Sequence, residues 1–99
     1  MFCLICMDRP GSKDLRLANR PDHVAYVLTS PAVATAGPFL GEDGKTMIGT
    51  LIVLDVETRA EAESWAGNDP YAKAGLFERV EIHPWKHLIG GLENPQANS

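Results

Sequence analysis

Two unbroken apolar segments restrict what this chain can fold into more than any other feature. The segment Phe2–Met7 is apolar at every position, and in Met47–Val56 both sets of alternating side chains are largely apolar. A strand with this pattern is buried on both faces, whereas a strand with one solvated face alternates between apolar and polar residues. We therefore expect a sheet whose central strands lie between a helical layer and a second cover.

The remaining segments complete an order of strands and helices. Pro38 confines one strand to a sheet edge. Asp43-Gly44 predicts a tight hairpin turn. Thr58 and Glu61 form the pattern of a capping box at a helix start. The predicted elements are a strand over 2–7, a helical region over 12–29 that bends near Pro21, an edge strand over 32–40, a strand over 47–56, a helix from Thr58 to Gly67 and a strand over 76–86. This β-α-β-β-α-β order is typical of the ferredoxin-like α+β fold, in which two helices cover one face of a four-stranded antiparallel sheet.

The composition excludes several classes of protein. The chain has 99 residues and a net charge of -4 at pH 7, and its basic residues are scattered, so we expect no nucleic-acid partner. No apolar run approaches the roughly 20 residues of a membrane span, and no basic segment precedes the apolar opening as in a signal peptide. With only two cysteines, a cytoplasmic protein with reduced thiols is expected. We expect one domain over residues 1–89 and a flexible, polar tail over 90–99.

The second sheet face predicts a partner. Because both helices of this fold lie on one face, the apolar side chains on the other face would be exposed in a monomer. A second copy that packs sheet to sheet about a two-fold axis is the simplest cover. We therefore expect a homodimer.

A short loop before the last strand carries residues suited to chemistry. The segment Asn68–Phe77 contains a carboxylate, Asp69, and a phenol, Tyr71. Pro70 keeps Asp69 out of a helix interior, and Pro70 and Gly75 together exclude a strand. A loop of this kind on a regular scaffold is a frequent place for functional residues.

His23, in the first helical region, is the best candidate partner for Asp69. Both helices of the predicted fold lie on the same sheet face, so residues from the two can reach one cleft. A carboxylate bonded to one imidazole nitrogen fixes the tautomer and prepares the other nitrogen as a general base or acid. Each residue also has an alternative role: His23 could bond to solvent or to Asp22, and Asp69 could cap local backbone N–H groups.

The pair Gly37-Pro38 on the edge strand has two interpretations. It could form a β-bulge that re-aims side chains near a site, or it could protect the edge against aggregation.

No metal or other cofactor is expected. His83 and His87 are four residues apart, which on a strand separates them by ~13 Å, so they are interpreted as surface histidines.

Several segments together resemble the YCII-related (YciI-like) family. They are Arg20–His23, Thr35–Pro38, Gly49–Val53, Asp69–Phe77 and Val80–Trp85, in register over roughly residues 2–88. The resemblance implies a ferredoxin-like chain that dimerises into an α/β barrel, similar in fold to enzymes such as muconolactone isomerase. It also implies an active site built on a His-Asp pair, which falls on His23 and Asp69. A lyase or dehalogenase role is associated with part of the family.

We therefore expect a small cofactor-free enzyme in which His23 is the general base or acid and Asp69 orients it. The residues expected to shape or polarise the substrate pocket are Arg20, Gly37, Pro38 and Tyr71. Such a base suits elimination or isomerisation of a small acid or phenol. Two alternatives remain open: a non-catalytic dimeric small-molecule-binding module, and an accessory protein in which the pair merely joins the helices.

Overall fold

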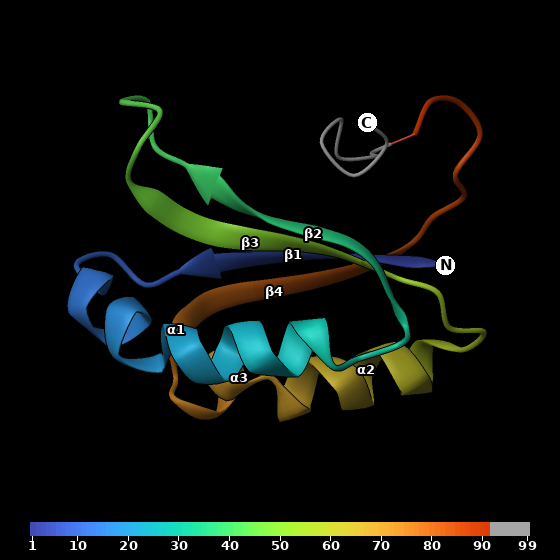
Figure 1. The fold of residues 1–99 in the computed structure, drawn as a ribbon, viewed down its shortest axis with the longest axis horizontal. Coiled ribbons are helices and arrows are strands. Elements are labelled where there is room, and N and C mark those ends of the chain that lie inside the picture. Colours follow the sequence, from blue (N-terminus) through green and yellow to red (C-terminus); the bar gives the residue numbers. More distant parts are fainter. Residues whose placement is uncertain (92–99) are drawn as a thin grey trace.

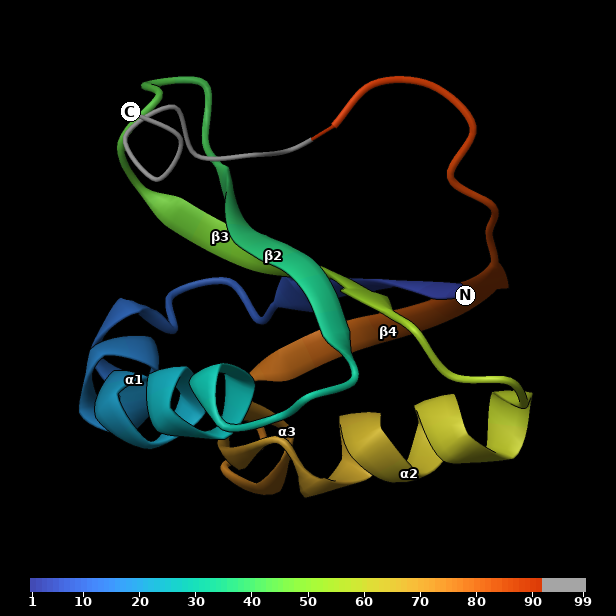
Figure 2. The same ribbon diagram turned by 45° about the vertical axis from the view of Figure 1, so that its right-hand side comes forward.

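The computed structural model describes residues 1–91, and the predicted element order is confirmed. The elements are β1 (Phe2–Asp8), α1 (Lys13–Leu28), β2 (Val33–Leu40), β3 (Met47–Leu54), α2 (Arg59–Asn68), α3 (Pro70–Lys73) and β4 (Phe77–Pro84). The strands form one antiparallel sheet in the order β2-β3-β1-β4. All helices lie on one face of this sheet (Figures 1 and 2). The chain thus has the ferredoxin-like α+β fold. Residues 92–99 of the predicted tail lie outside the described residues.

The two apolar segments form the centre of the sheet. Leu4 of β1 pairs with Ile52 of β3, and both are fully buried. They pack with Leu54 and with Ala62 of α2 in a single core cluster. Because side chains alternate along a strand, these residues occupy the helical side of the sheet. Burial of their apolar area is the main stabilising term for this layer.

The opposite sheet face has no helical cover; it is apolar over β1 and β3 and carries Arg79, Glu81 and His83 on β4. Ile5 pairs with Leu51 on this side, and both side chains are half-buried. The segment after β4 rises on this side in both views (Figures 1 and 2). The second copy that would cover this face stays a prediction.

Helix α2 ends differently from the prediction. The expected C-terminal role of Gly67 is wrong, because α2 continues to Asn68 and Gly67 does not have a positive φ. Pro70 restricts the residue before it, and Asp69 accordingly has an extended backbone (φ -62°, ψ 128°) that ends the helix without a left-handed glycine.

The segment predicted as a loop contains a further helical turn, α3. Pro70 occupies its first turn, where a missing N–H costs nothing, and Asp69 is its N-cap. Gly75, with φ 75°, then turns the chain back into β4. The first helical region is a single element, since α1 runs unbroken through Pro21. In residues 1–91 we find no helix with the length and hydropathy needed to cross a bilayer.

Candidate active site

His23 and Asp69 lie in direct contact beneath the sheet. The Nδ1 atom of His23, on α1, is 2.8 Å from Oδ1 of Asp69 at the start of α3, although the residues are 46 positions apart. Both residues are buried: 8% of the whole surface of His23 and 1% of that of Asp69 is exposed. An ionised carboxylate can only accept, so Nδ1 donates the hydrogen in this contact, and in the neutral imidazole Nε2 is the acceptor. The contact predicted from the sequence is therefore present.

A second hydrogen bond fixes the carboxylate of Asp69. The backbone N–H of Tyr71 donates to the same Oδ1 atom at 2.9 Å, as in an N-capped helix. The carboxylate is therefore held by its own short helix and presented to His23 in one orientation. Pro70 contributes indirectly, since it keeps the Asp69 backbone extended.

The Tyr71 ring covers one face of the His23 imidazole and limits its orientation. The two rings are stacked, with centroids 3.9 Å apart and an angle of 14° between their planes. Tyr71 is 1% exposed, and Phe77 contacts it edge-on. Burial raises the pKa of the Tyr71 hydroxyl, and Arg16 and Arg20 oppose that rise. The imidazole is thus held by a hydrogen bond at one edge and a stacked ring on one face.

Arg16 is a site residue that the sequence interpretation missed. Its guanidinium lies 4.7 Å from the Tyr71 ring centroid, and the residue is 5% exposed. One nitrogen, Nη1, donates to both carboxylate oxygens of Asp8 at 3.0 and 2.9 Å. The other, Nη2, donates to the Thr50 hydroxyl at 2.8 Å and to the Gly49 carbonyl at 3.1 Å. Nε of Arg16 is buried and has no partner among the described residues.

The helical spacing of the sequence could have indicated that Arg16 belongs to the site. It lies four residues before Arg20 and seven before His23, so all three share one face of α1. Its partner Asp8 is the last residue of β1. Burial raises the pKa of Asp8, and the Arg16 charge opposes the rise.

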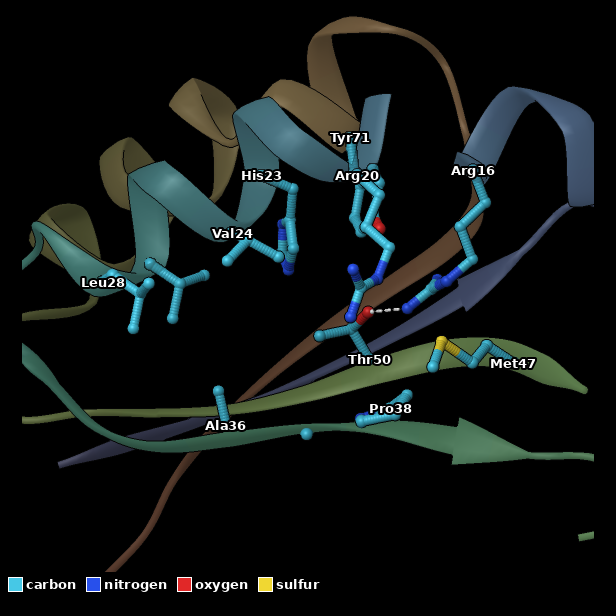
Figure 3. Close-up of a pocket in the computed structure, with 12 residues that line it drawn as sticks. Arg16, Arg20, His23, Val24, Leu28, Ala36, Pro38, Met47, Thr50 and Tyr71 are labelled. Atoms are coloured by element: carbon cyan, nitrogen blue, oxygen red, sulfur yellow. Dashed lines mark hydrogen bonds between the residues drawn. The ribbon is translucent and has the colours of Figure 1, made fainter. Parts of the chain in front are cut away.

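A cavity of about 180 Å³ separates α1 from β2 and β3, with His23 in its wall (Figure 3). Its lining consists of Arg16, Arg20, His23, Val24, Val27, Leu28, Ala36, Gly37, Pro38, Met47, Thr50 and Tyr71. The volume suits one ring, since an apolar cavity of about 150 Å³ binds benzene in another protein. Arg20 also reaches into the cavity in this view. The four residues predicted to bind substrate all line it, and their binding role stays a prediction.

The edge position of Gly37-Pro38 is confirmed, but a bulge at this pair is not observed. Pro38 pairs with Thr50, and the register shifts lie on either side, near Val33 and Leu40. Ala36 and Pro38 are exposed because the cavity, not a helix, lies over this end of β2. Within residues 1–91 no group of three His, Cys, Asp or Glu side chains is placed to hold a metal ion.

The chain is similar to known proteins in sequence and in structure. Protein YciI from Escherichia coli O6:H1 is 29% identical over 97 residues, which cover 90% of this chain and 99% of that protein. The chain is 38% identical in sequence to 5-chloro-2-hydroxyhydroquinone dehydrochlorinase (TftG) from Burkholderia phenoliruptrix AC1100. The solved structure of that protein is a complex with 2,5-dihydroxybenzoquinone. The similarity covers 88% of this chain and 95% of that one, with a TM-score of 0.77.

A more distant similarity concerns the fold alone. A putative antibiotic biosynthesis monooxygenase from Bacteriodes thetaiotaomicron VPI-5482 aligns at a TM-score of 0.58 with 14% identity, over 94% of this chain and 92% of that one. The sequence model of the YCII-related domain matches residues 1–86, which include every element from β1 to β4. The chain therefore belongs to the YCII-related domain family.

Proposed function

We propose that this protein is a lyase or isomerase that uses His23 and Asp69 for general acid–base chemistry on a small ring-bearing molecule. One observation carries the proposal: the buried His23–Asp69 contact of 2.8 Å belongs to a histidine that also lines a ring-sized cavity. A paired imidazole at a cavity wall is the arrangement that proton transfer requires.

His23 would act through Nε2, the nitrogen that Asp69 does not engage. Nε2 takes a proton from a substrate hydroxyl, and Asp69 stabilises the imidazolium without taking the proton itself. The stacked Tyr71 ring limits rotation of the imidazole while Nε2 takes up the proton and while it gives the proton back. The same nitrogen can then return the proton to a ring carbon, so that one residue serves as base and acid.

The cations of the cavity suit the negative charge that develops on the substrate oxygen. Arg16 and Arg20 both line the cavity, and the Tyr71 hydroxyl, whose pKa is raised by burial, remains a hydrogen-bond donor. Donors aimed at a developing oxyanion in a partly buried site contribute strongly to rate. Because Asp8 balances the charge of Arg16, the proposed stabilisers of an enolate or phenolate are Arg20 and the Tyr71 hydroxyl.

Loss of hydrogen halide (HX) from a halogenated hydroquinone shows how atoms and electrons would balance in such a reaction. The base moves a proton from a hydroxyl oxygen to the ring carbon that carries the halogen, giving a keto tautomer. Removal of a second hydroxyl proton then expels the halide with its electron pair. The substrate loses one proton and one halide ion, and the ring becomes a quinone without an external oxidant. The similar Burkholderia protein is a dehydrochlorinase, which supports this class of reaction.

The test uses 5-chloro-2-hydroxyhydroquinone and a panel of other halogenated hydroquinones under argon, which prevents autoxidation. We expect wild-type protein to release halide from at least one member, measured by ion chromatography and quinone absorbance. His23→Gln should remove this activity while it still binds 2,5-dihydroxybenzoquinone. Equal rates for wild type and His23→Gln, or no turnover of any member by wild type, would contradict the proposal.

We also propose that the protein acts as a homodimer. Ile5 and Leu51 remain half-buried on a sheet face without helices, which supports a sheet-to-sheet contact with a second copy. Light scattering at micromolar concentration should give twice the mass of one chain. A monomer at these concentrations is the opposing result.

A further inference from the structure

The face of α1 that borders the cavity changes character along its length. Lys13, Arg16 and Arg20 lie on its first half, and Val24 and Val27 lie on its second half. These positions recur every three or four residues, so they share one face of the helix. His23 lies where the two halves meet. Figure 3 shows the arginines at one end of the cavity and Val24, Leu28 and Ala36 at the other.

A second cavity extends the basic end. It has a volume of about 290 Å³ and shares Arg16, Arg20 and Met47 with the cavity beside His23. Lys13, at the start of α1, and Lys45, in the β2–β3 turn, complete its charged lining. The two cavities thus adjoin at Arg16, Arg20 and Met47, and together they are called the groove, apolar at one end and basic at the other.

The charge of this groove is opposite to that of the chain. Four of the nine Lys and Arg residues line it, and none of the twelve Asp and Glu residues within residues 1–91 does, although the net charge of the chain is -4. Arg16 is neutralised by Asp8. Lys13, Arg20 and Lys45 form no ion pair with any residue of 1–91.

The nearest carboxylate to Lys45 in the sequence, Asp43, is engaged elsewhere. Its oxygens accept hydrogen bonds from the backbone N–H groups of Lys45 and Thr46 and from the Thr46 hydroxyl. These bonds lower the pKa of Asp43 to about 2, so it serves the turn as a fixed anion. The Lys45 ammonium is left for the groove.

We propose that the substrate is an amphipathic acid whose anionic oxygen group binds at Lys13 and Lys45 while its ring lies beside His23. This inference deepens the proposed function and rests on it, because it takes the cavity at His23 as the substrate site. The carboxylate or similar oxyanion anchors one end, and the apolar end of the groove receives the ring. The two ends together orient the ring so that one edge faces Nε2 of His23.

The experiment compares ligands that differ only in the anionic group. The probes are 2,5-dihydroxybenzoate, 2,5-dihydroxyphenylacetate and 3-(2,5-dihydroxyphenyl)propanoate, each with its neutral carboxamide, and binding is measured by calorimetry. The three chain lengths cover different distances between ring and carboxylate. We expect at least one acid to bind about tenfold more tightly than its amide, and this preference to weaken as salt is added.

Charge-removing variants locate the anchor. Lys13→Gln and Lys45→Gln should each reduce the preference for the acid about threefold, and the double variant should abolish it, with amide binding unchanged. Lys86→Gln, an exposed lysine that lines neither cavity, is the matched control and should behave as wild type. No acid preference in any pair, or a preference that survives the double variant, would overturn the inference.

The two proposals can fail separately. Loss of the acid preference in the double variant together with absent turnover would leave the basic anchor standing and reject the acid–base activity. Turnover that depends on His23 without any acid preference would reject the anchor alone. Retained amide binding in the variants shows that they remain folded.

Discussion

Two histidine–carboxylate pairs lie within residues 1–91, and they differ in almost everything except their chemistry. His23 Nδ1 is 2.8 Å from Asp69, with side chains 10% and 2% exposed. His83 Nε2 is 3.1 Å from Glu81, with side chains 55% and 38% exposed. The first pair joins two helices, whereas the second joins neighbours on β4.

The surroundings explain why only the first pair is a candidate site. Asp69 is held by a backbone N–H, and His23 is stacked on Tyr71 at a cavity wall. Glu81 is shared with the guanidinium of Arg79 at 3.0 Å, on the sheet face that bears no helices and lies opposite the cavity. A histidine beside a carboxylate is thus a weak signal by itself, and the fixed orientation and the cavity give it meaning.

The largest expected difference between the two pairs is in turnover. His23→Gln should lower the rate of halide release about 10²- to 10⁴-fold, because the general base is removed. His83→Gln should leave it within about twofold, since this side chain lies on the sheet face opposite the cavity. Steady-state rates on one substrate measure both. Comparable losses in the two variants would erase the distinction between the pairs.

The neighbouring arginines extend the comparison to stability. Arg16→Met breaks a buried ion pair and leaves Asp8 without its cation, so we expect a loss of about 3–5 kcal/mol in the free energy of unfolding. Arg79→Met removes an exposed pair and should cost less than about 1 kcal/mol. Urea denaturation followed by circular dichroism measures both values. A small loss for Arg16→Met would mean that this charge is not a structural element of the site.

The next largest difference is expected between variants of the two carboxylates, Asp69 and Glu81. Asp69→Ala removes the N-cap of α3 and should destabilise the protein by about 1–2 kcal/mol, whereas Asp69→Asn retains an acceptor and costs less. Both variants should lose turnover, because neither fixes the imidazole tautomer. Glu81→Ala, on the sheet face opposite the cavity, serves as the control and should leave turnover within about twofold. Thermal unfolding and rates of halide release separate the capping role of Asp69 from its orienting role.

The smallest expected effect concerns the Tyr71 hydroxyl. Tyr71→Phe keeps the stacked ring, and the described residues provide no hydrogen-bond partner for the hydroxyl, so the free energy of unfolding should change by less than about 0.5 kcal/mol. Turnover should fall about threefold to tenfold if this hydroxyl stabilises the developing oxyanion. Unchanged turnover would reduce Tyr71 to an orienting ring.

Particular residues show how far the sequence can be interpreted. The apolar pattern of β1 and β3 predicted central strands, and Pro38 predicted the edge strand. The same reasoning missed α3, because one helical turn is too short for a periodic pattern. It also missed Arg16, since an arginine is normally exposed and its partners Asp8 and Thr50 come from other elements.

The sequence by itself determined the order of the four strands and the two longer helices, because turn residues, caps and apolar periods act over a few neighbouring positions. It also placed Asp69 at a break that Pro70 enforces. Only the tertiary structure decided that Asp69 meets His23, 46 positions away, and that Tyr71 and Arg16 support the contact. A period tells which face a residue occupies, but the packing of α1 against α3 decides which side chain it meets there.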